Sequence, residues 1–575
     1  MTSFRDRLRV SKLMAPDSKL TASVSTLKAR RTRRTLFSVV LLLASCSAIG
    51  SLVGQKVTAQ SATDESSLRD SLHQFTDVYA LVEQNYAEPL DTDKVDKAIY
   101  DGAIPGMLHS LDPHSNFYDA KAFAQMREEQ HGKYYGVGMS ILPQPDKAGV
   151  LHVFVLSPFE GTPAYKAGIL PGDMIMTVDG KSVEGMDSAH VAALLKGDKG
   201  THVIVTMKRE GKDATLTFDL IRDAIPRPSV DLAFMLKPGV GYIHVTGFME
   251  TTSREVGDAL QKFQTTGGGL HGLILDLRAN PGGLLNEAVN VSDKFLQEGQ
   301  IVVSQHGRAF PDQVYRASHG EEGTEKYPIV VVVNRNTASA AEIVSGALQD
   351  HDRALIVGET TFGKGLVQTV FQLDDNTMGL ALTTYHYYTP SGRLIQRSYD
   401  GVSLYDYYYV RDDAKKADKS NLEVKLTDSG RTVYGGGGIT PDEKIDVPDL
   451  NHFQASLIQH YVFIYGGIGS FGKHYLAGHT MSRDFVVNDA VLQQFKEFLK
   501  ANQVEFTDAD IAGSQEWIKD NIKAELFTSQ FGQLEGLKVR TQSDPEITKA
   551  TTFLPEALAL EGRDKSPQKT AILNH

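Results

Sequence analysis

The sequence predicts a multidomain protein in which an α/β core contains a β-rich insertion and is flanked by helical regions. Three observations support this fold class. The chain has 575 residues, more than one hydrophobic core usually holds. Strand-like and helix-like segments alternate from about 230 to 389, as is typical of an α/β core. Short strands with glycine turns precede this part, and amphipathic helices follow it.

Bulk composition limits the classes of protein that fit. Hydrophobic residues make up 41% and charged residues 23%, which is ordinary for a globular protein. The formal net charge is −12, and an acidic body argues against nucleic acid as the main partner. Cys46 is the only cysteine, which excludes a disulfide framework and a cysteine zinc site. The 18 histidines form no metal-binding motif, so we expect no metal and no cofactor.

The N-terminus carries a pattern for export or anchoring. Segment 1–34 is strongly basic, whereas segment 35–55 has no charge and is long enough to span a bilayer. The same stretch could be a cleaved signal, because "TRRTLF" resembles a twin-arginine signal, "LASC" at Cys46 a lipoprotein site and "VTA" before Gln60 a peptidase site. We expect membrane association through 35–55 and a body on the exported, periplasmic side of a bacterial inner membrane, anchored or processed.

A polar linker over 56–66 leads to a helical region over 67–130. Its first helix is indicated by apolar residues at helical spacing, namely Leu68, Leu72, Phe75, Val78 and Val82. A second helix is expected from 95 to 108, and "LDPHSNFYD" then breaks the pattern. His109 and His114 fall around this break, and we interpret them as turn and packing residues.

The segment 131–222 is expected to be a β-rich unit with one helix near 188–195, ended by "IPRPS". "GVGM" and "TPAYKAGILPGDMIMTVDGKSV" resemble the carboxylate loop and the helix-turn-strand signature of PDZ domains. In such a loop, successive N–H groups form a nest for a terminal carboxylate, and the peptide pairs with an open strand edge. The resemblance implies that the loop is formed by Gly136, Val137, Gly138 and Met139.

The segment 223–450 is expected to form the α/β core. The strand "IVVVVN" gives way to a helix at Ser339, so this hydroxyl lies near unpaired N–H groups at the positive end of a helix. Those groups are what an acyl-transfer oxyanion needs. Serines are common at helix starts, so this position alone is weak evidence of catalysis.

The stretch "ALIVGETTFGKGL" contains a near-match to a phosphate-binding loop. Gly358, four residues, then Gly363 and Lys364 give the spacing G-x-x-x-x-G-K after an apolar strand. The next residue should be Ser or Thr to hold magnesium, but it is Gly365. Lys364 is therefore either a phosphate ligand in an atypical loop or a lysine with a different role.

Several motifs in a fixed order resemble the C-terminal processing peptidases, also called tail-specific proteases. Ser339, Lys364 and Gln368 follow "LDLRANPGG", while "LDPHS" precedes the PDZ-like unit and "YYTPSGRLIQ" and "GGGGITPD" follow the lysine. The resemblance covers roughly 68–447. It implies a crotonase-like α/β protease core with an inserted PDZ domain, and it leaves 451–575 as a mostly helical extension.

The resemblance also implies the roles of individual residues. Ser339 would be the nucleophile, Lys364 the general base and Gln368 the residue that positions the lysine amine. The oxyanion hole would use Ala340 and the glycine turn at Gly282 and Gly283.

A base must be neutral, which requires lowering the lysine pKa from about 10.4 to about 7–8 by desolvation. The residues from 360 to 373 contain no acid, which is consistent with such a pocket. A histidine mechanism using His386 with Asp276 or Glu342 is the alternative chemistry. Glu342, on the same helix face as Ser339, either orients the site or is merely solvated.

The sequence thus predicts an exported serine endopeptidase that recognises accessible, apolar protein C-termini through its PDZ domain and cuts by a Ser-Lys mechanism. The alternative function is a catalytically silent PDZ adaptor in the cell envelope. In this family the PDZ unit often gates the protease, which we carry over as a hypothesis. The oligomeric state stays open.

Overall fold

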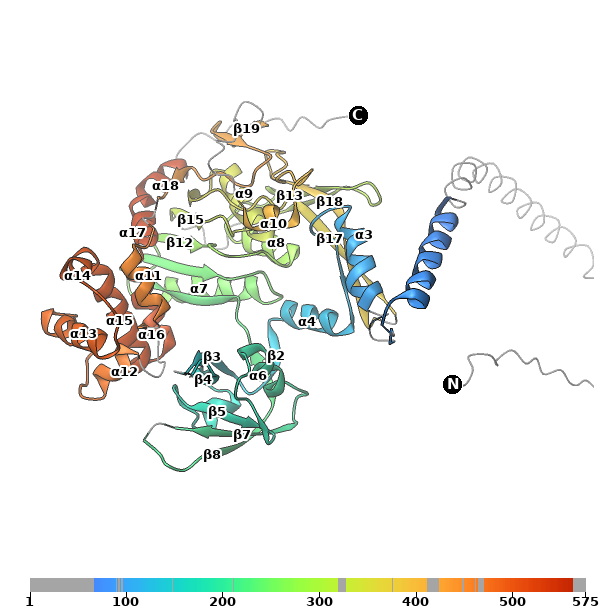
Figure 1. Cartoon of the computed structure of the whole chain (residues 1–575). Coiled ribbons are helices and arrows are strands. Elements are labelled where there is room, and N and C mark those ends of the chain that lie inside the picture. Colours follow the sequence, from blue (N-terminus) through green and yellow to red (C-terminus); the bar gives the residue numbers. More distant parts are fainter. Residues whose placement is uncertain are drawn as a thin grey trace, which may run out of the picture. The chain divides into compact units, whose positions relative to one another are not determined.

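The computed structural model describes residues 67–561 except 89, 92–93, 95–96, 147, 210, 319–326, 375, 411–422, 447–448, 461 and 464–469 (Figure 1). The segments 1–34, 35–55 with Cys46, and 56–66 therefore lie outside the described residues. The chain divides into two compact units, Met1–Ala98 and Ile99–His575. Within the described part of the chain, no helix has the length and apolar character needed to cross a bilayer.

The described part of the first unit contains a long helix over 67–85, as the apolar spacing predicts. The five apolar side chains that indicated it are all exposed, with 49–60% of their surface accessible. The second unit begins with the helices η1 (Ala98–Ala103, which starts at the boundary), α3 (Ile104–His109) and α4 (Ala120–Gln130). Between the last two lies a short strand, β1 (Asn116–Tyr118), which the sequence did not indicate.

The predicted β-rich unit is confirmed as a PDZ-type sheet. The strands in spatial order are β3 (Met139–Pro145), β4 (Leu151–Pro158), β5 (Met174–Val178), β7 (His202–Lys208) and β8 (Leu216–Ile221), with β6 (Lys181–Ser182) beside β5. Alternation decides which side chains are buried: Val203, Val205 and Met207 of β7 are fully buried. Strand β2 (Lys133–Gly136) begins the unit and β9 (Asp223–Pro226) ends it, and the two strands pair antiparallel.

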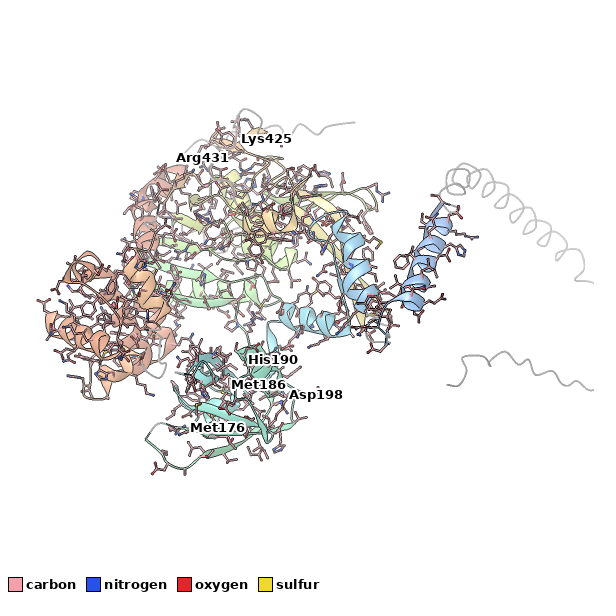
Figure 2. The ribbon with its side chains drawn as sticks, viewed as in Figure 1. Met176, Met186, His190, Asp198, Lys425 and Arg431 are labelled. Atoms are coloured by element: carbon pink, nitrogen blue, oxygen red, sulfur yellow. The ribbon has the colours of Figure 1, made fainter. Side chains whose placement is uncertain are left out.

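One edge of this PDZ sheet is open, and a helix packs beside it. Strand β3 is the edge strand, and α6 (Ser188–Leu195) contacts it; the short helix α5 (Pro163–Lys166) lies elsewhere in the unit. The carboxylate of Asp187 caps α6 by accepting the His190 N–H at 2.9 Å, and Figure 2 labels His190 on this unit. An edge strand beside a helix is the arrangement on which PDZ-type domains receive an extended peptide.

The α/β core is built on a six-stranded sheet. Its strands in spatial order are β10 (Val230–Lys237), β11 (Val240–Val245), β12 (Gly272–Asp276), β15 (Ile329–Val333), β16 (Leu355–Gly358) and β21 (Glu443–Lys444). All neighbours are parallel except β10, which runs antiparallel to β11. Every residue of β12 and β15 is buried, which explains why these strands are unbroken apolar runs in the sequence.

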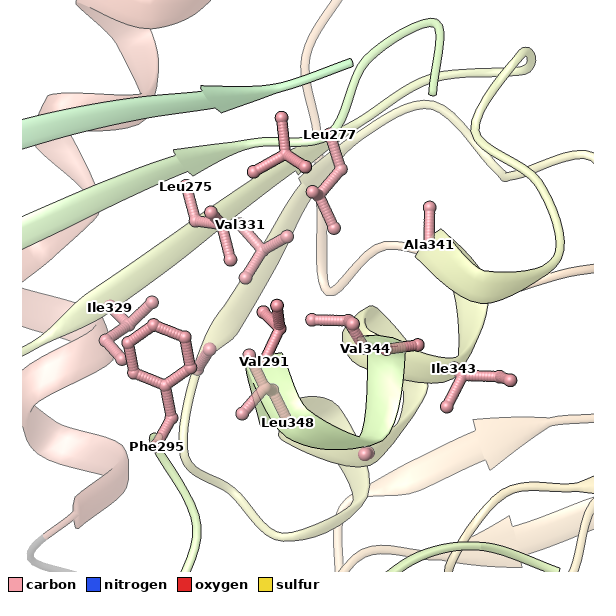
Figure 3. Close-up of a cluster of buried hydrophobic side chains, with 14 of the residues drawn as sticks. Leu275, Leu277, Val291, Phe295, Ile329, Val331, Ala341, Ile343, Val344 and Leu348 are labelled. Atoms are coloured by element: carbon pink, nitrogen blue, oxygen red, sulfur yellow. The ribbon is translucent and has the colours of Figure 1, made fainter. Parts of the chain in front are cut away.

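Helices cover both faces of this sheet. One face packs against α7 (Thr252–Thr265), α8 (Leu285–Asp293) and α9 (Ala340–Asp350), and Figure 3 shows Phe295, Val344 and Leu348 in this cluster with Val331. The other face packs against α16 (Gln533–Ser543), α17 (Pro545–Thr552) and α18 (Leu554–Glu561). The end of the expected C-terminal extension is therefore a layer of the α/β core, and Figure 1 shows α17 and α18 along it.

A second, antiparallel sheet carries the lysine segment. Its order is β1, β18 (Met378–Tyr388), β13 (Ile301–His306) and β14 (Gln313–Arg316), and β17 (Leu366–Leu373) also pairs with β18. Strand β17 begins two residues after Lys364. Because β1 pairs with β18, with Phe117 opposite Leu380, the "LDPHS" segment before β1 is brought to this same sheet.

The remaining elements lie after the second sheet. They are α10 (Leu404–Tyr409), the ribbon β19 (Val424–Leu426) and β20 (Thr432–Tyr434), and the helices α11 (His452–Gln459), α12 (Phe471–Leu476), α13 (Asp489–Ala501), α14 (Asp508–Gly513) and α15 (Gln515–Phe531). The helices from α11 to α15 share a separate apolar cluster. They fit the helical extension that the sequence predicts.

This C-terminal cluster contains a buried carboxylate. Glu525 is fully buried, and its Oε1 accepts the N–H of Gly472 at 2.9 Å, whereas its Oε2 has no hydrogen-bond partner among the described residues. A side chain at 472 would lie 2.9 Å from the Glu525 carboxyl group, which explains the glycine there. Burial raises the pKa of Glu525 to about 8, although hydrogen bonds from Ser470 and Gly472 oppose the shift.

We predict that this buried group makes the C-terminal cluster less stable as the pH rises. A pKa raised on folding means that Glu525 contributes its full stability below its unfolded value of 4.5 and loses it as pH rises through about 8. Glu525→Gln should therefore match the wild type near pH 5 and exceed it by roughly 4 kcal/mol near pH 8. Urea unfolding of the full chain, followed by the fluorescence of its single tryptophan, Trp517 on α15, measures this difference.

Glu516→Gln is the matched control, because Glu516 lies on the same helix with 82% of its side chain exposed. It should leave the pH dependence unchanged. An equal pH dependence in Glu525→Gln and in the wild type would contradict the assignment.

Candidate active site

Ser339 lies at the junction between β15 and α9, where the sequence pattern places it. Its backbone has φ 55° and ψ −116°, a conformation that residues other than glycine rarely adopt. Buried hydrogen bonds hold the preceding turn in place. The Thr337 hydroxyl donates to the carbonyl of Leu277 at 2.8 Å and accepts the Asn334 N–H at 2.9 Å. Ser339 is therefore presented on a strained turn at the start of a buried helix.

The glycine turn at Gly282 and Gly283 lies directly against this serine. An added Cβ on Gly282 would lie 2.7 Å from the Ser339 Cβ and 2.9 Å from the Ala340 nitrogen. An added Cβ on Gly283 would lie 2.1 Å from the carbonyl oxygen of Phe248. Both glycines have positive φ, 99° and 142°. The close approach of this turn to α9 thus requires glycine at both positions.

The turn and the helix start supply backbone donors next to the serine. The Gly282 N–H donates to the side-chain oxygen of Asn280 at 2.9 Å and is therefore already engaged. In the described part of the chain, the N–H groups of Gly283 and Ala340 have no acceptor. Two such donors beside a hydroxyl are the arrangement that stabilises a tetrahedral oxyanion.

Lys364 lies in the loop between β16 and β17 and is half-buried. Neighbouring segments hold this loop through its backbone. The Gly365 N–H donates to the Gln396 side chain at 2.8 Å, and the Arg397 N–H donates to the Gly363 carbonyl at 2.8 Å. Glycine at 363 and 365 allows the close approach, since an added Cβ at either position would lie 3.0 Å or less from backbone nitrogen atoms.

Glu342 joins the serine turn to the lysine loop. Its side chain is fully buried, and its Oε2 accepts the N–H groups of both Ser339, at 2.8 Å, and Lys364, at 2.9 Å. Its Oε1 accepts the Gly363 N–H at 2.7 Å and the Thr361 hydroxyl at 2.5 Å. A single carboxylate oxygen therefore brings together the two residues that the sequence singled out. Of the two interpretations left open for Glu342, the buried one that orients the site fits this geometry.

Burial governs the protonation of this pair. It lowers the pKa of the Lys364 ammonium, and the negative charges of Glu342 and Asp112 oppose the shift. Burial raises the pKa of Glu342, against four hydrogen bonds that favour its ionised form. The lysine is thus moved towards the neutral form that a general base requires.

Gln368 lies on β17 near the lysine loop. Its side-chain amide donates to the Thr383 hydroxyl of β18 at 3.0 Å. The Thr383 N–H in turn donates to the hydroxyl of Ser115 at 3.0 Å. Among the described residues, no hydrogen bond joins Gln368 to Lys364.

Two residues of "LDPHS" are close to the lysine, which the sequence interpretation missed. The positive charge of Lys364 acts on His114, and the negative charge of Asp112 acts on Lys364. The pairing of β1 with β18 brings this segment to the lysine. A strand of only three residues gives no sequence pattern that predicts such a pairing. Packing, the role expected for His114, thus occurs beside the candidate base.

A cavity of about 670 Å³ opens beside the glycine turn. Leu284, which follows Gly283, lines it together with Leu285, Val367 and Tyr385. Its remaining lining is largely polar and acidic: Glu250, Asn286, Glu287, Gln305, Phe310, Gln313, Tyr315 and Thr369. Two of its lining residues, Leu284 and Val367, lie close in sequence to the glycine turn and to Lys364.

The residues of the alternative chemistries are not arranged for them. His386 is exposed on β18. Asp276 instead pairs with Arg278 at 2.7 Å and accepts the Tyr242 hydroxyl at 2.8 Å. Within the described residues, no group of three His, Cys, Asp or Glu side chains could hold a metal ion.

The predicted carboxylate loop of the PDZ unit lies just before the edge strand β3. Gly138 has φ 78°, and an added Cβ would lie 2.4 Å from the Thr162 Cβ. Its carbonyl accepts the Phe159 N–H at 2.9 Å and the Thr162 hydroxyl at 2.8 Å. Gly136, Val137 and Met139 flank it, all buried. The loop is thus a fixed backbone turn at the start of the edge strand β3.

Comparison with known families identifies three matching regions. The profile of peptidase family S41 matches residues 239–403, that of the PDZ domain matches 154–209, and that of the activating protease CtpB N-terminal domain matches 43–122.

Individual relatives agree with these matches. The carboxy-terminal-processing protease of Bartonella bacilliformis is 38% identical over 366 residues, which cover 63% of this chain and 80% of the relative. The carboxy-terminal processing protease CtpA of Bacillus subtilis is 36% identical over 348 residues, which cover 60% and 70%. The solved structure of a photosystem II D1 C-terminal processing protease is 32% identical, covers 56% of this chain and 89% of its own, and superposes with a TM-score of 0.31.

The extent of this similarity, together with a PDZ unit and an S41 core in the same order along the chain, settles the family. The chain belongs to peptidase family S41, as a carboxy-terminal processing serine protease with a PDZ domain.

Proposed function

We propose that the protein is an exported endopeptidase that binds the C-terminus of a protein substrate in its PDZ groove and cleaves by a Ser-Lys mechanism. The observation that carries this proposal is the Glu342 carboxylate, whose single Oε2 accepts the N–H groups of both Ser339 and Lys364. The direction of the Lys364 pKa shift is the second support, since burial favours its neutral amine.

The proposed chemistry uses these groups in two stages. The Ser339 oxygen attacks the scissile carbonyl carbon while the Lys364 amine takes the hydroxyl proton. The N–H groups of Ala340 and Gly283 stabilise the oxyanion. When the intermediate collapses, the C–N bond breaks and the lysine proton passes to the departing amine. Water then attacks the carbonyl carbon of the acyl-serine ester while the Lys364 amine takes a water proton. The ester C–O bond breaks as this proton passes to the Ser339 oxygen, and the acid product leaves. No cofactor takes part in these steps.

Gln368 is proposed as a positioning residue that acts through Thr383 on the strand pair following the lysine loop. The cavity lined by Leu284, Val367 and Tyr385 is proposed to take the substrate side chain beside the scissile bond. Its polar and acidic rim would limit the size and charge of that side chain.

We predict that Ser339→Ala and Lys364→Ala each reduce cleavage of an unfolded protein with an apolar C-terminus by about 10³-fold or more. Ser345→Ala is the matched control, because Ser345 lies on the same helix and its hydroxyl donates to the carbonyl of Ala341. It should retain wild-type activity. Cleavage is measured by the appearance of fragments, and folding by the thermal unfolding of each variant.

This experiment also separates the protease from the rival function, a silent PDZ adaptor. An adaptor would bind the same substrate without cutting it. Normal cleavage by Lys364→Ala would refute the proposed base while leaving the S41 family assignment intact.

We further predict that the substrate's terminal carboxylate contributes to recognition. Replacing it by a carboxamide removes charge-assisted hydrogen bonds to the loop around Gly138, which should raise KM about tenfold or more. The control is a short ester substrate too small to bridge the groove and the active site. Its hydrolysis should not respond to amidation. An unchanged KM for the amidated protein would argue against PDZ recognition of the carboxylate.

Export is proposed from the basic segment 1–34 and the uncharged segment 35–55. We predict that the chain is recovered from the membrane or periplasmic fraction, and intact mass should then identify an uncleaved anchor, a lipidated Cys46 or cleavage before Gln60. An unmodified full-length chain in the soluble cytoplasmic fraction would contradict this proposal.

A further inference from the structure

His114 belongs to a chain of hydrogen bonds that starts at the lysine loop. The Gly365 N–H donates to Gln396 Oε1 at 2.8 Å, and Gln396 Nε2 donates to the Tyr407 hydroxyl at 3.1 Å. The Tyr407 hydroxyl lies 3.0 Å from His114 Nε2. Four segments are joined here: the loop before β1, the lysine loop before β17, the segment after β18 that contains Gln396, and α10.

The donors and acceptors of this chain are compatible with a neutral imidazole. The Tyr408 hydroxyl donates to the carbonyl of Pro113 at 2.7 Å, so towards His114 Nδ1, at 3.3 Å, it can only accept. The Nδ1 atom therefore carries a hydrogen, and Nε2 accepts from the Tyr407 hydroxyl, whose oxygen already accepts from Gln396. Every partner is satisfied by a neutral histidine. Burial lowers the pKa of His114 to about 3, and the Lys364 charge adds to this shift.

Aromatic rings surround the imidazole on the side of the lysine loop. The centroid of the His114 ring lies 5.5 Å from that of Tyr407, 6.0 Å from Tyr408 and 6.4 Å from Phe362, all edge to face. Phe362 precedes Lys364 by two residues and also packs against Tyr407 at 5.5 Å. Tyr407 itself is 3% exposed. These four rings, His114, Phe362, Tyr407 and Tyr408, form a continuous wall.

Of the charged groups around this wall, Asp112 and Glu342 are held by other partners, whereas Arg397 packs on the wall itself. Asp112 accepts the N–H groups of His114 and Ser115 and the hydroxyl of Ser115, at 2.6–2.8 Å. The Arg397 guanidinium stacks over Phe362 and Tyr407, with its carbon 4.5 Å from each ring centroid. Glu342 accepts from the lysine loop on the opposite side. The wall includes Phe362 of the lysine loop, and the charges of Asp112 and Glu342 act on Lys364.

We propose that His114 is a positioning residue which, held neutral by Tyr407 and Tyr408, completes an aromatic wall that keeps water away from the Lys364 amine. This inference rests on the proposed role of Lys364 as the general base. It assigns a shared role to "LDPHS" and to α10, which are both distant from Lys364 in sequence. Their aromatic rings add to the apolar neighbours of Lys364, which alone do not exclude water from its amine. The histidine itself transfers no proton.

The test is the pH dependence of kcat/KM for a short substrate, measured with the full chain from about pH 6 to pH 10. In the wild type the rate should rise with pH as the lysine becomes neutral. His114→Ala opens the wall to water and should move this rise upward by about one pH unit or more, so that the rate near pH 7 falls about tenfold. The rate at high pH should approach that of the wild type.

His114→Phe is the decisive companion, because it keeps an aromatic ring but can neither donate, accept nor carry a proton. It should retain most of the wild-type profile. Tyr407→Phe, which keeps its ring and loses the hydroxyl that holds His114, should shift the profile in the same direction by less. His109→Ala is the matched control, since His109 is exposed on the same segment, and its profile should be unchanged.

A loss of rate by the same factor at every pH in His114→Ala, or an equal impairment in His114→Phe, would overturn the proposal. So would a shifted profile in His109→Ala. These outcomes are distinct from failure of the proposed mechanism, which Lys364→Ala tests separately. If Lys364→Ala is inactive and His114→Ala loses rate uniformly, the lysine remains the base and only the wall is refuted.

Discussion

The candidate active site depends on one buried carboxylate. Glu342 accepts four hydrogen bonds, and through them it fixes a strained serine turn and a lysine loop that belong to different segments of the chain. A buried carboxylate is costly unless its lone pairs are filled, and unpaired backbone N–H groups are costly as well. The Glu342 carboxylate and the N–H groups that it accepts therefore satisfy each other's hydrogen-bonding requirements. The strain at Ser339, with φ 55°, persists because the surrounding bonds over-determine it.

The same interaction explains why the lysine loop resembles a phosphate-binding loop and is arranged differently. In a phosphate-binding loop, successive N–H groups point at the phosphate oxygens. Here the N–H groups of Gly363 and Lys364 point at the oxygens of Glu342, an internal anion. Close packing also requires glycine at 363 and 365, since both residues lie against the segment 396–397. A similar spacing of glycine and lysine thus arises from a different packing requirement.

Part of the candidate site could be predicted from the sequence because it depends on patterns of neighbouring residues. An apolar run that ends at Ser339 before a helix, and the paired glycines at 282 and 283, are signals carried by adjacent residues. Glu342 was ambiguous because a carboxylate three residues into a helix is equally common in solvent, and its burial depends on α9 lying under the sheet. His114 was interpreted as a packing residue, and its neighbours proved to be Phe362, Tyr407 and Tyr408, from segments about 250 to 290 positions away.

Periodicity and turn chemistry act over a few residues, so the sequence by itself determined the order of the units and most strand and helix types. The expected roles of the serine, lysine and glycines were implied by the family resemblance. The tertiary structure decided which of these residues meet. The pairing of β1 with β18, the seating of α16–α18 on the far face of the core sheet, and the convergence of two loops on Glu342 are contacts of high sequence separation. No local pattern encodes them, since they result from burying whole apolar faces together.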